Sequence, residues 1–181
     1  LGDFDLPAGA QLFVWNQDRT QFLGSFTEAN EKDWGFLPLG LLDDDQVVVE
    51  YQEPESVHGL GDVRISQIVH GYRSLLLHPQ NPEANQANMG PFGNSGACNI
   101  NVNCPEGAAW QTQKRSVALI TNGGYAVCTG SLVNNTLEDG TPYFLTANHC
   151  LGNPNSWVYY FNHESSTCDG NTGPTNQSIS G

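Results

Sequence analysis

The segment LTANHC at residues 145–150 places a histidine, His149, directly before a cysteine, Cys150. It overlaps residues 142–147 (PYFLTA), in which aromatic and β-branched side chains predict a β-strand. This strand ends just before the histidine. A general base needs fixed placement, because a misplacement of about 1 Å can lower a rate roughly 100-fold. His149 is therefore the first candidate for a catalytic residue.

Three further strands are predicted around this segment. Residues 116–121 (SVALIT) are an apolar run that leads into residues 122–124 (NGG), a typical hairpin turn, and residues 125–133 (YAVCTGSLV) form the returning strand. Residues 157–161 (WVYYF) are rich in aromatic and β-branched side chains, which favour strands. No long run of strong helix formers occurs in the sequence. An all-β fold is therefore expected.

The N-terminal region has the same character. Residues 10–16 (AQLFVWN) and 21–26 (QFLGSF) flank a turn-like cluster, which predicts a hairpin. Residues 46–51 (QVVVEY) predict a third strand, and the alternation in residues 62–72 (DVRISQIVHGY) predicts a half-buried fourth. Short strands separated by turns predict an antiparallel β-sandwich. The aspartates at 43–45 are interpreted as a solvated turn, because the ligand spacing of a calcium-binding EF-hand is absent.

Residues 78–97 are rich in Pro, Asn and Gly, a composition that predicts a linker open to proteolytic processing. The predicted organisation is a sandwich-like domain at residues 1–77, this linker, and a second domain at residues 98–181. The first domain is expected to be incomplete at its start. No signal peptide is visible, since the first residues are acidic and lack Met, which predicts a mature or trimmed N-terminus.

The charge of the chain excludes two classes of partner. The formal net charge is −13, and residues 1–92 carry 14 acidic and 4 basic side chains against 5 and 2 in residues 93–181. Nucleic acids and anionic membranes attract basic proteins, so neither is an expected partner. No stretch approaches the length of a transmembrane helix, so no membrane insertion is expected.

All five cysteines lie in the second half, at Cys98, Cys104, Cys128, Cys150 and Cys168. None forms a C-x-x-C pair, which disfavours a zinc ribbon or a thioredoxin-type redox site and favours disulfides in an oxidising compartment. Because five is odd, at least one thiol lacks a partner within the chain. A zinc site built from His149, His163 and nearby cysteines stays an alternative, although the usual close ligand pairs are missing. No metal and no cofactor are expected.

The segments around His149 resemble the histidine region of chymotrypsin-fold serine proteases, and more specifically the bacterial secreted lysyl endopeptidases. The start of the second domain at residues 96–107 (GACNINVNCPEG), the strand motif at 128–133 (CTGSLV) and the motif at 143–150 (YFLTANHC) carry this resemblance. It extends from residue 93 to about residue 181. It implies that residues 98–181 are the N-terminal part of a trypsin-like domain, mainly the first half of a chymotrypsin-like double β-barrel.

The resemblance also implies roles for single residues. His149 corresponds to the triad histidine, the general base that takes the proton of the nucleophile and returns it to the leaving amine. Cys128 with Cys150 corresponds to the disulfide beside it, and Cys104 with Cys168 to a second one. Cys98 corresponds to a cysteine whose partner lies later in the family's sequences, so it is expected to be unpaired in this chain.

The sequence departs from the family in its other catalytic residues. It contains no GDSG segment, Ser131 lies in the strand before the histidine, and Asp169 adjoins Cys168 where the family has no catalytic acid. The triad aspartate and serine are therefore expected to be absent from residues 1–181. Without a serine nucleophile, acyl transfer cannot occur, so this chain alone is expected to be inactive.

The acidic region at residues 1–77 resembles the segment upstream of the protease in bacterial trypsin-like precursors, which implies a pro-domain. The predicted protein is the precursor, or zymogen, of a secreted serine endopeptidase that reaches the outside through the periplasm, acts on peptide or protein substrates and cleaves after lysine. Two alternatives stay open. One is a non-catalytic secreted binding or adhesion protein on a degenerate protease fold, and the other is a precursor captured as cargo of a secretion machine.

Overall fold

The computed structural model describes residues 2–70, 98–170, 173–174 and 177–180. These residues form two compact units, one made mainly of residues 2–70 and the other mainly of residues 98–179. The expected all-β class is confirmed, because the described residues form ten strands in three sheets, and their helices are all short 3-10 helices. The predicted linker at residues 78–97 lies outside the described residues, and none of the described helices is long and apolar enough to cross a membrane.

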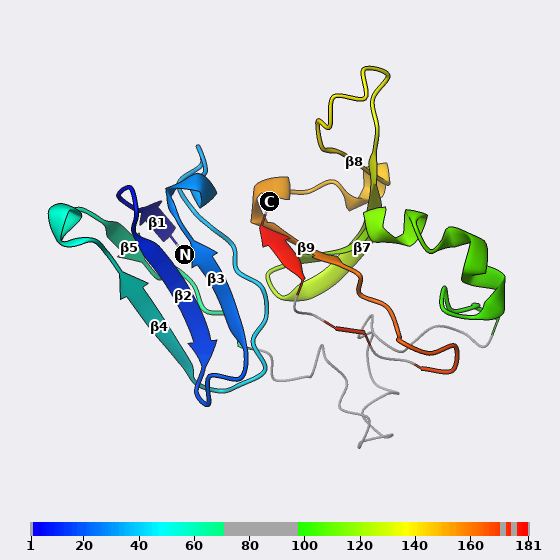
Figure 1. Ribbon diagram of the computed structural model, residues 1–181, viewed down its shortest axis with the longest axis horizontal. Coiled ribbons are helices and arrows are strands. Elements are labelled where there is room, and N and C mark those ends of the chain that lie inside the picture. Colours follow the sequence, from blue (N-terminus) through cyan, green and yellow to red (C-terminus); the bar gives the residue numbers. More distant parts are fainter. Residues whose placement is uncertain (1, 71–97, 171–172, 175–176, 181) are drawn as a thin grey trace. The chain divides into compact units, whose positions relative to one another are not determined.

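The first unit contains two small antiparallel sheets (Figure 1). In the larger one, β2 (Gln11–Asn16) lies between β3 (Phe22–Phe26) and β4 (Val47–Gln52), with Trp15 opposite Phe22 on one side and Val48 on the other. The predicted hairpin between β2 and β3 is therefore confirmed. The smaller sheet joins β1 (Gly2–Asp5) to β5 (Asp62–Arg64).

The prediction of one long, half-buried strand over residues 62–72 was wrong. The strand β5 ends at Arg64, and beyond it Ile65 and Ile68 are 55% and 79% exposed. Residues 71 and 72 lie outside the described residues. The physical reason is that β5 pairs only with β1 among the described strands, and this pairing runs only as far as Gly2 opposite Arg64. An alternating pattern does not form a strand where no partner strand completes its hydrogen bonds.

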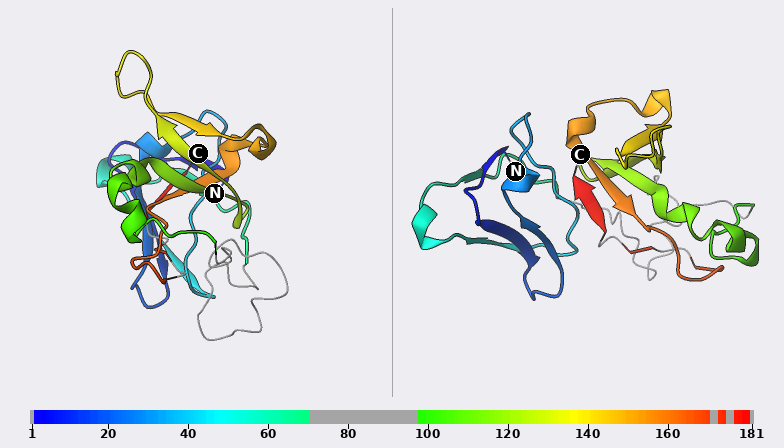
Figure 2. Two further views of the ribbon diagram at one scale, coloured as in Figure 1. Left: turned by 90° about the vertical axis from the view of Figure 1, so that its right-hand side faces the viewer. Right: turned by 45° about the horizontal axis from the view of Figure 1, so that its top comes forward.

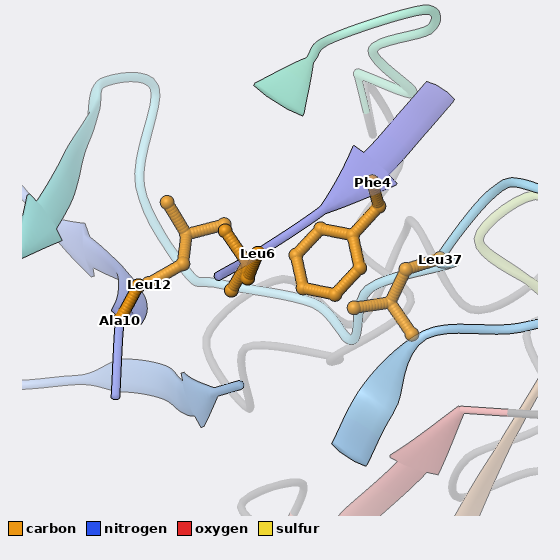
Figure 3. Packing of buried hydrophobic residues seen from close by; sticks show 5 residues of the cluster. All are labelled: Phe4, Leu6, Ala10, Leu12 and Leu37. Atoms are coloured by element: carbon orange, nitrogen blue, oxygen red, sulfur yellow. The ribbon is translucent and has the colours of Figure 1, made fainter. Parts of the chain in front are cut away.

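The core of the first unit takes side chains from both of its sheets. Its buried residues are Phe4, Leu6, Ala10, Leu12 and Leu37, and Figure 3 shows their side chains converging. Phe26 and Val63 pack against this cluster and are partly buried. Because Phe4 comes from β1 and Leu12 from β2, the two sheets are held together by one small apolar cluster rather than by separate cores.

The second unit is built on one five-stranded antiparallel sheet in the order β10-β9-β6-β7-β8. The bounds are β6 (Val117–Asn122), β7 (Tyr125–Val133), β8 (Tyr143–Thr146), β9 (Trp157–Phe161) and β10 (Ser178–Ser180). The expected hairpin turn is present at Gly123 and Gly124, whose φ angles of +56° and +79° suit glycine. Ile120, Trp157 and Tyr160 are almost completely buried along β6 and β9.

Short 3-10 helices connect these strands: η1 (Glu28–Asn30), η2 (Glu55–Val57), η4 (Pro105–Trp110), η5 (Gln113–Ser116), η6 (Asn148–Cys150) and η7 (Pro154–Ser156). Two of them lie directly next to the strands β6 and β8. The helix η5 leads directly into β6, and η6 follows β8 after the single extended residue Ala147. His149 is thus carried by a helical turn that is fixed to the end of a strand.

Candidate functional site

The strand β8 and the turn η6 set the backbone position of His149. Ala147 is extended, with φ −75° and ψ 145°, and its carbonyl oxygen accepts a hydrogen bond of 2.9 Å from the backbone N–H of Cys150. The N–H of Leu151 donates to the carbonyl oxygen of Asn148 at 3.2 Å. These two bonds close a single turn around His149, so the strand end that the sequence predicts continues into a defined 3-10 turn.

The strand β8 pairs closely with its neighbour β7. Gly130 lies opposite Thr146, and Ser131 lies opposite Leu145. A Cβ atom on Gly130 would lie 2.2 Å from Cε1 of Phe144 and 2.6 Å from the carbonyl oxygen of Leu145. The hydroxyl of Thr146 adds a hydrogen bond of 2.9 Å to the carbonyl oxygen of Thr129. A glycine at 130 is therefore needed for the close approach that positions the histidine-bearing end of β8.

A disulfide between Cys128 and Cys150 joins β7 to the turn that carries His149. The Cα atoms of the two cysteines are 6.0 Å apart, and the residues are 22 apart in sequence. Loop closure of this length removes conformational freedom from the unfolded chain worth about 3 kcal/mol. This pair is the one that the family resemblance implies, and it lies directly beside the candidate base.

The side chain of His149 is exposed to solvent. Among the described residues no carboxylate forms an ion pair with its imidazole. His149, Cys128 and Cys150 bring ligand-type atoms within 4.8 Å of one another. Because both cysteines are joined in the disulfide, neither offers the thiolate that a zinc ion requires, and this cluster is a poor metal site.

Two other polar residues considered from the sequence lie elsewhere. Ser131 is half-buried within β7, where its hydroxyl lies 2.9 Å from the hydroxyl of Ser116 and donates to the carbonyl oxygen of Leu132 at 3.1 Å. Asp169 is exposed in the segment after the last aromatic strand, next to Cys168. The structure gives neither of them a contact with His149 among the described residues.

A second disulfide, between Cys104 and Cys168, closes a separation of 64 residues. It ties the start of the second unit to the segment that follows β9. Cys98 is exposed and has no disulfide partner among the described residues. The pairing again matches the one implied by the family resemblance, and both disulfides lie in the second unit.

A polar cluster beside this second disulfide was not found from the sequence. The ammonium group of Lys114 forms an ion pair with Glu164 and donates a hydrogen bond of 2.9 Å to Oδ1 of Asn103. The side-chain amide of Asn103 donates in turn to the carbonyl oxygen of Ser165. Residues 50 apart in sequence meet here, and no local pattern in the chain indicates such a contact.

His163, the second histidine of the zinc alternative, has its own surroundings. Its Nδ1 lies 2.9 Å from the carbonyl oxygen of Pro174, and burial lowers the pKa of its imidazole below the ordinary value. The described cluster of ligand-type atoms around His149 does not include it. The structure therefore does not bring the two histidines together as one zinc site within the part of the chain that it describes.

The arrangement around His149 suits proton transfer to and from a bound molecule. An exposed imidazole on a backbone fixed by strand pairing and a disulfide is accessible to a substrate and does not need to be reorganised. His149 is carried by η6 just beyond the end of β8, and Figure 2 shows this yellow-to-orange part of the ribbon from two further sides. This geometry provides a base but, among the described residues, neither a nucleophile nor an orienting carboxylate next to it.

Comparison with known protein families gives a match for the second unit. The family described as "Lysyl endopeptidase, C-terminal domain" matches residues 92–181. The matched range contains His149, both disulfides and the whole five-stranded sheet as far as the structure describes it. The chain is therefore related to the lysyl endopeptidases over this range, and the family implies a serine peptidase in the intact protein.

Proposed function

We propose that the intact protein is a secreted serine endopeptidase that cleaves on the carboxyl side of lysine, with His149 as its general base. The observation that carries the proposal is the family match over residues 92–181, because the matched range holds a histidine fixed at the end of β8 by its own disulfide. Lysine specificity comes from the family alone.

The proposed chemistry is acyl transfer in two steps. The imidazole of His149 takes the proton of a serine hydroxyl as its oxygen attacks the peptide carbonyl, and it returns the proton to the leaving amine. Water then hydrolyses the acyl-enzyme with the same base. The serine and the aspartate of the triad must come from sequence outside residues 1–181, because no GDSG segment lies within them. Residues 1–181 alone are accordingly proposed to be inactive.

The first unit is proposed to be a pro-domain, and residues 78–97 the region of processing. Two features of the first unit support this assignment. It contains no cysteine, whereas the second unit carries two disulfides, so no disulfide ties the first unit to the second and it can be removed once the peptide chain between them is cut. It also carries most of the negative charge of the chain. The disulfides and the family both fit a secreted protein.

A serine-directed phosphonate probe tests the proposed enzyme class. The full-length, processed protein is expected to be labelled, and His149→Ala is expected to abolish labelling because the serine is no longer activated. Asp169→Asn is the matched control, since Asp169 is an exposed residue of the second unit without a contact to His149 among the described residues, and its change should leave labelling unchanged. Absence of labelling in the processed wild-type protein would exclude a serine peptidase and favour the binding-protein alternative.

Substrate preference is tested separately with peptides that differ only in the residue before the scissile bond. The proposal requires faster cleavage after lysine than after arginine or alanine. Equal rates after lysine and arginine would overturn lysine specificity while leaving the serine endopeptidase intact. If the full-length gene lacks the serine and the protein is recovered only in complex with secretion components, the cargo alternative replaces the enzyme.

A further inference from the structure

The sequence contains only two lysines, Lys32 in the first unit and Lys114 in the second. We propose that, in the folded protein, the Lys32–Asp33 bond is the site at which a lysine-specific endopeptidase cuts this chain, and that the Lys114–Arg115 bond is shielded. The inference rests on the lysine specificity proposed above. It makes the first unit a substrate of the mature enzyme and makes the second unit resistant to it.

Cleavage after lysine requires the whole lysine side chain to leave the protein surface and enter a pocket of the protease. The ammonium group must exchange its present partners for those of the pocket, and the backbone on both sides of the bond must become extended. The cost of both steps differs between the two lysines, because local unfolding energies vary widely across a folded protein.

The side chain of Lys114 is held on its own unit. Its ammonium group contacts Glu164 and Asn103, and the Lys114 and Glu164 side chains are only 18% and 21% exposed. Asn103 is itself anchored to the carbonyl oxygen of Ser165, beside the disulfide between Cys104 and Cys168. Withdrawing Lys114 would leave a half-buried carboxylate without its cation, which is unfavourable.

The backbone at Lys114 is also part of the folded frame. Lys114 lies in η5, and its carbonyl oxygen, which belongs to the bond to be cut, accepts a hydrogen bond from the backbone N–H of Val117. Val117 is the first residue of β6, whose Ala118 and Ile120 are among the most buried residues of the chain. Extending the backbone at Lys114 therefore disturbs the entry to β6, a strand paired on both sides.

Lys32 is held by much weaker local contacts. Its ammonium group lies 5.7 Å from the ring centre of Trp34, a side chain that is 37% exposed, and no carboxylate pairs with it among the described residues. Its carbonyl oxygen accepts one hydrogen bond of 2.8 Å, from the backbone N–H of Gly35 in the same turn. Lys32 is half-buried, but opening this turn breaks only that hydrogen bond within it, and neither Lys32 nor Asp33 lies in a described strand.

The position of Lys32 makes the cut consequential for the first unit. Hydrolysis adds water across the Lys32–Asp33 bond, leaving a carboxylate on Lys32 and an amino group on Asp33. The bond lies between β3 and β4, so β2 and its partner β4 end on different fragments, as do β1 and β5. The sheets of the first unit are then held only by non-covalent contacts, while the second unit stays intact.

The test uses the 181-residue chain in its oxidised form and a lysine-specific endopeptidase added from outside, with the products followed by intact mass. We expect cleavage after Lys32 to be at least about tenfold faster than cleavage after Lys114, because only the second requires withdrawal from a folded frame. No cleavage after Lys32 under conditions that fully digest the reduced and denatured chain would overturn the proposal, as would equal rates at the two lysines.

Glu164→Gln tests the shield directly, because it removes the carboxylate that holds Lys114 and is expected to raise cleavage after Lys114 at least about threefold. Glu106→Gln is the matched control, an exposed acid in the same unit that forms no ion pair among the described residues. Lys114→Arg removes the second site and should leave the rate of cleavage after Lys32 unchanged. Asn103→Ala, which removes the other partner of the Lys114 ammonium group, takes the place of Glu164→Gln if that variant fails to fold. The added enzyme keeps this test independent of the chain's own activity, which the phosphonate probe measures.

Discussion

The two units of this protein are stabilised in different ways. The first has a small apolar core of five buried residues, no cysteine, and an outer strand β4 on which Val47, Val48 and Val49 are 38% to 52% exposed. The second has a five-stranded sheet, two disulfides and a half-buried ion pair. Covalent closure of long loops is therefore confined to the unit that carries His149.

This difference fits the roles proposed for the two units. An enzyme that works outside the cell needs a catalytic base whose position does not depend on marginal non-covalent stability, and the disulfide at Cys150 provides this next to His149. A pro-domain has to be removed after folding, and a unit held only by a small core and short strands can be removed by one cut.

Reduction of the disulfides should have the largest effect and should affect only the second unit. In the chain-entropy model the two disulfides contribute about 3 and about 4 kcal/mol for separations of 22 and 64 residues. We expect amide hydrogen exchange in β6–β9 to accelerate strongly on addition of dithiothreitol, while exchange in β2–β4 stays the same because the first unit has no cysteine. Equal acceleration in both units would show that they unfold together.

Leu12→Ala should be the reciprocal change for the first unit. Leu12 is 1% exposed within the apolar cluster, and loss of a buried leucine side chain costs about 2–5 kcal/mol. A unit of this size has little stability to lose, so we expect its unfolding transition to disappear while the second unit keeps its own. Leu60→Ala, at a leucine that is 68% exposed in the same unit, is the control and should change neither transition in thermal unfolding.

Gly130→Ala should weaken the second unit next to the candidate base. The new Cβ would lie 2.2 Å from an aromatic carbon of Phe144 and 2.6 Å from the carbonyl oxygen of Leu145, so β8 must shift away from β7. Overpacking of this kind costs about 1–3 kcal/mol. Chemical denaturation should show the loss, and Gly152→Ala should not, because nothing lies within 4 Å of its Cβ position. An unchanged midpoint for Gly130→Ala would contradict the close pairing of β7 and β8.

Strands whose sequence and surroundings agree could be predicted from the sequence. The ranges 125–133 and 157–161 match β7 and β9 at both ends, and the turn at Gly123 and Gly124 was expected from its residues. Short strands without a local signal were missed, namely β1 and β10, because such segments become strands only when a distant partner pairs with them. The same dependence on a partner explains why the expected strand over residues 62–72 ends at Arg64.

The candidate site was predictable in part, and for two different reasons. The placement of His149 at a strand end follows from residues 142–150 themselves, whereas the cysteine pairs came from the family resemblance and not from the spacing. No local sequence pattern predicts the contact between Lys114 and Glu164. Ion pairs between segments far apart depend on the folded chain path, and charge patterns report only neighbours along a helix or strand.

The two units should respond differently to acid. In the first unit, hydrogen bonds from Thr20, from the backbone of Gln17 and from the hydroxyl of Tyr51 lower the pKa values of Asp18, Asp44 and Glu53, respectively. A carboxyl group whose pKa is lower in the folded state stabilises the fold above its ordinary pKa, here 3.8 for Asp and 4.5 for Glu. That stabilisation is lost as the pH falls through the lowered folded-state values, so the first unit should weaken only below about pH 4.5.

The second unit should begin to weaken at a higher pH. Burial lowers the pKa of His163 from its ordinary value of 6.5, so the unfolded chain binds a proton more readily than the folded one. Stability of the second unit therefore falls as the pH drops below 6.5, before the carboxyl groups of the first unit respond. Hydrogen exchange measured between pH 8 and pH 4 should show the second unit losing stability before the first. His163→Gln should remove the loss of stability that begins below pH 6.5 from the second unit and leave the first unit unchanged. The assignment would be contradicted if the first unit weakened before the second, or if the second unit still lost stability just below pH 6.5 in His163→Gln.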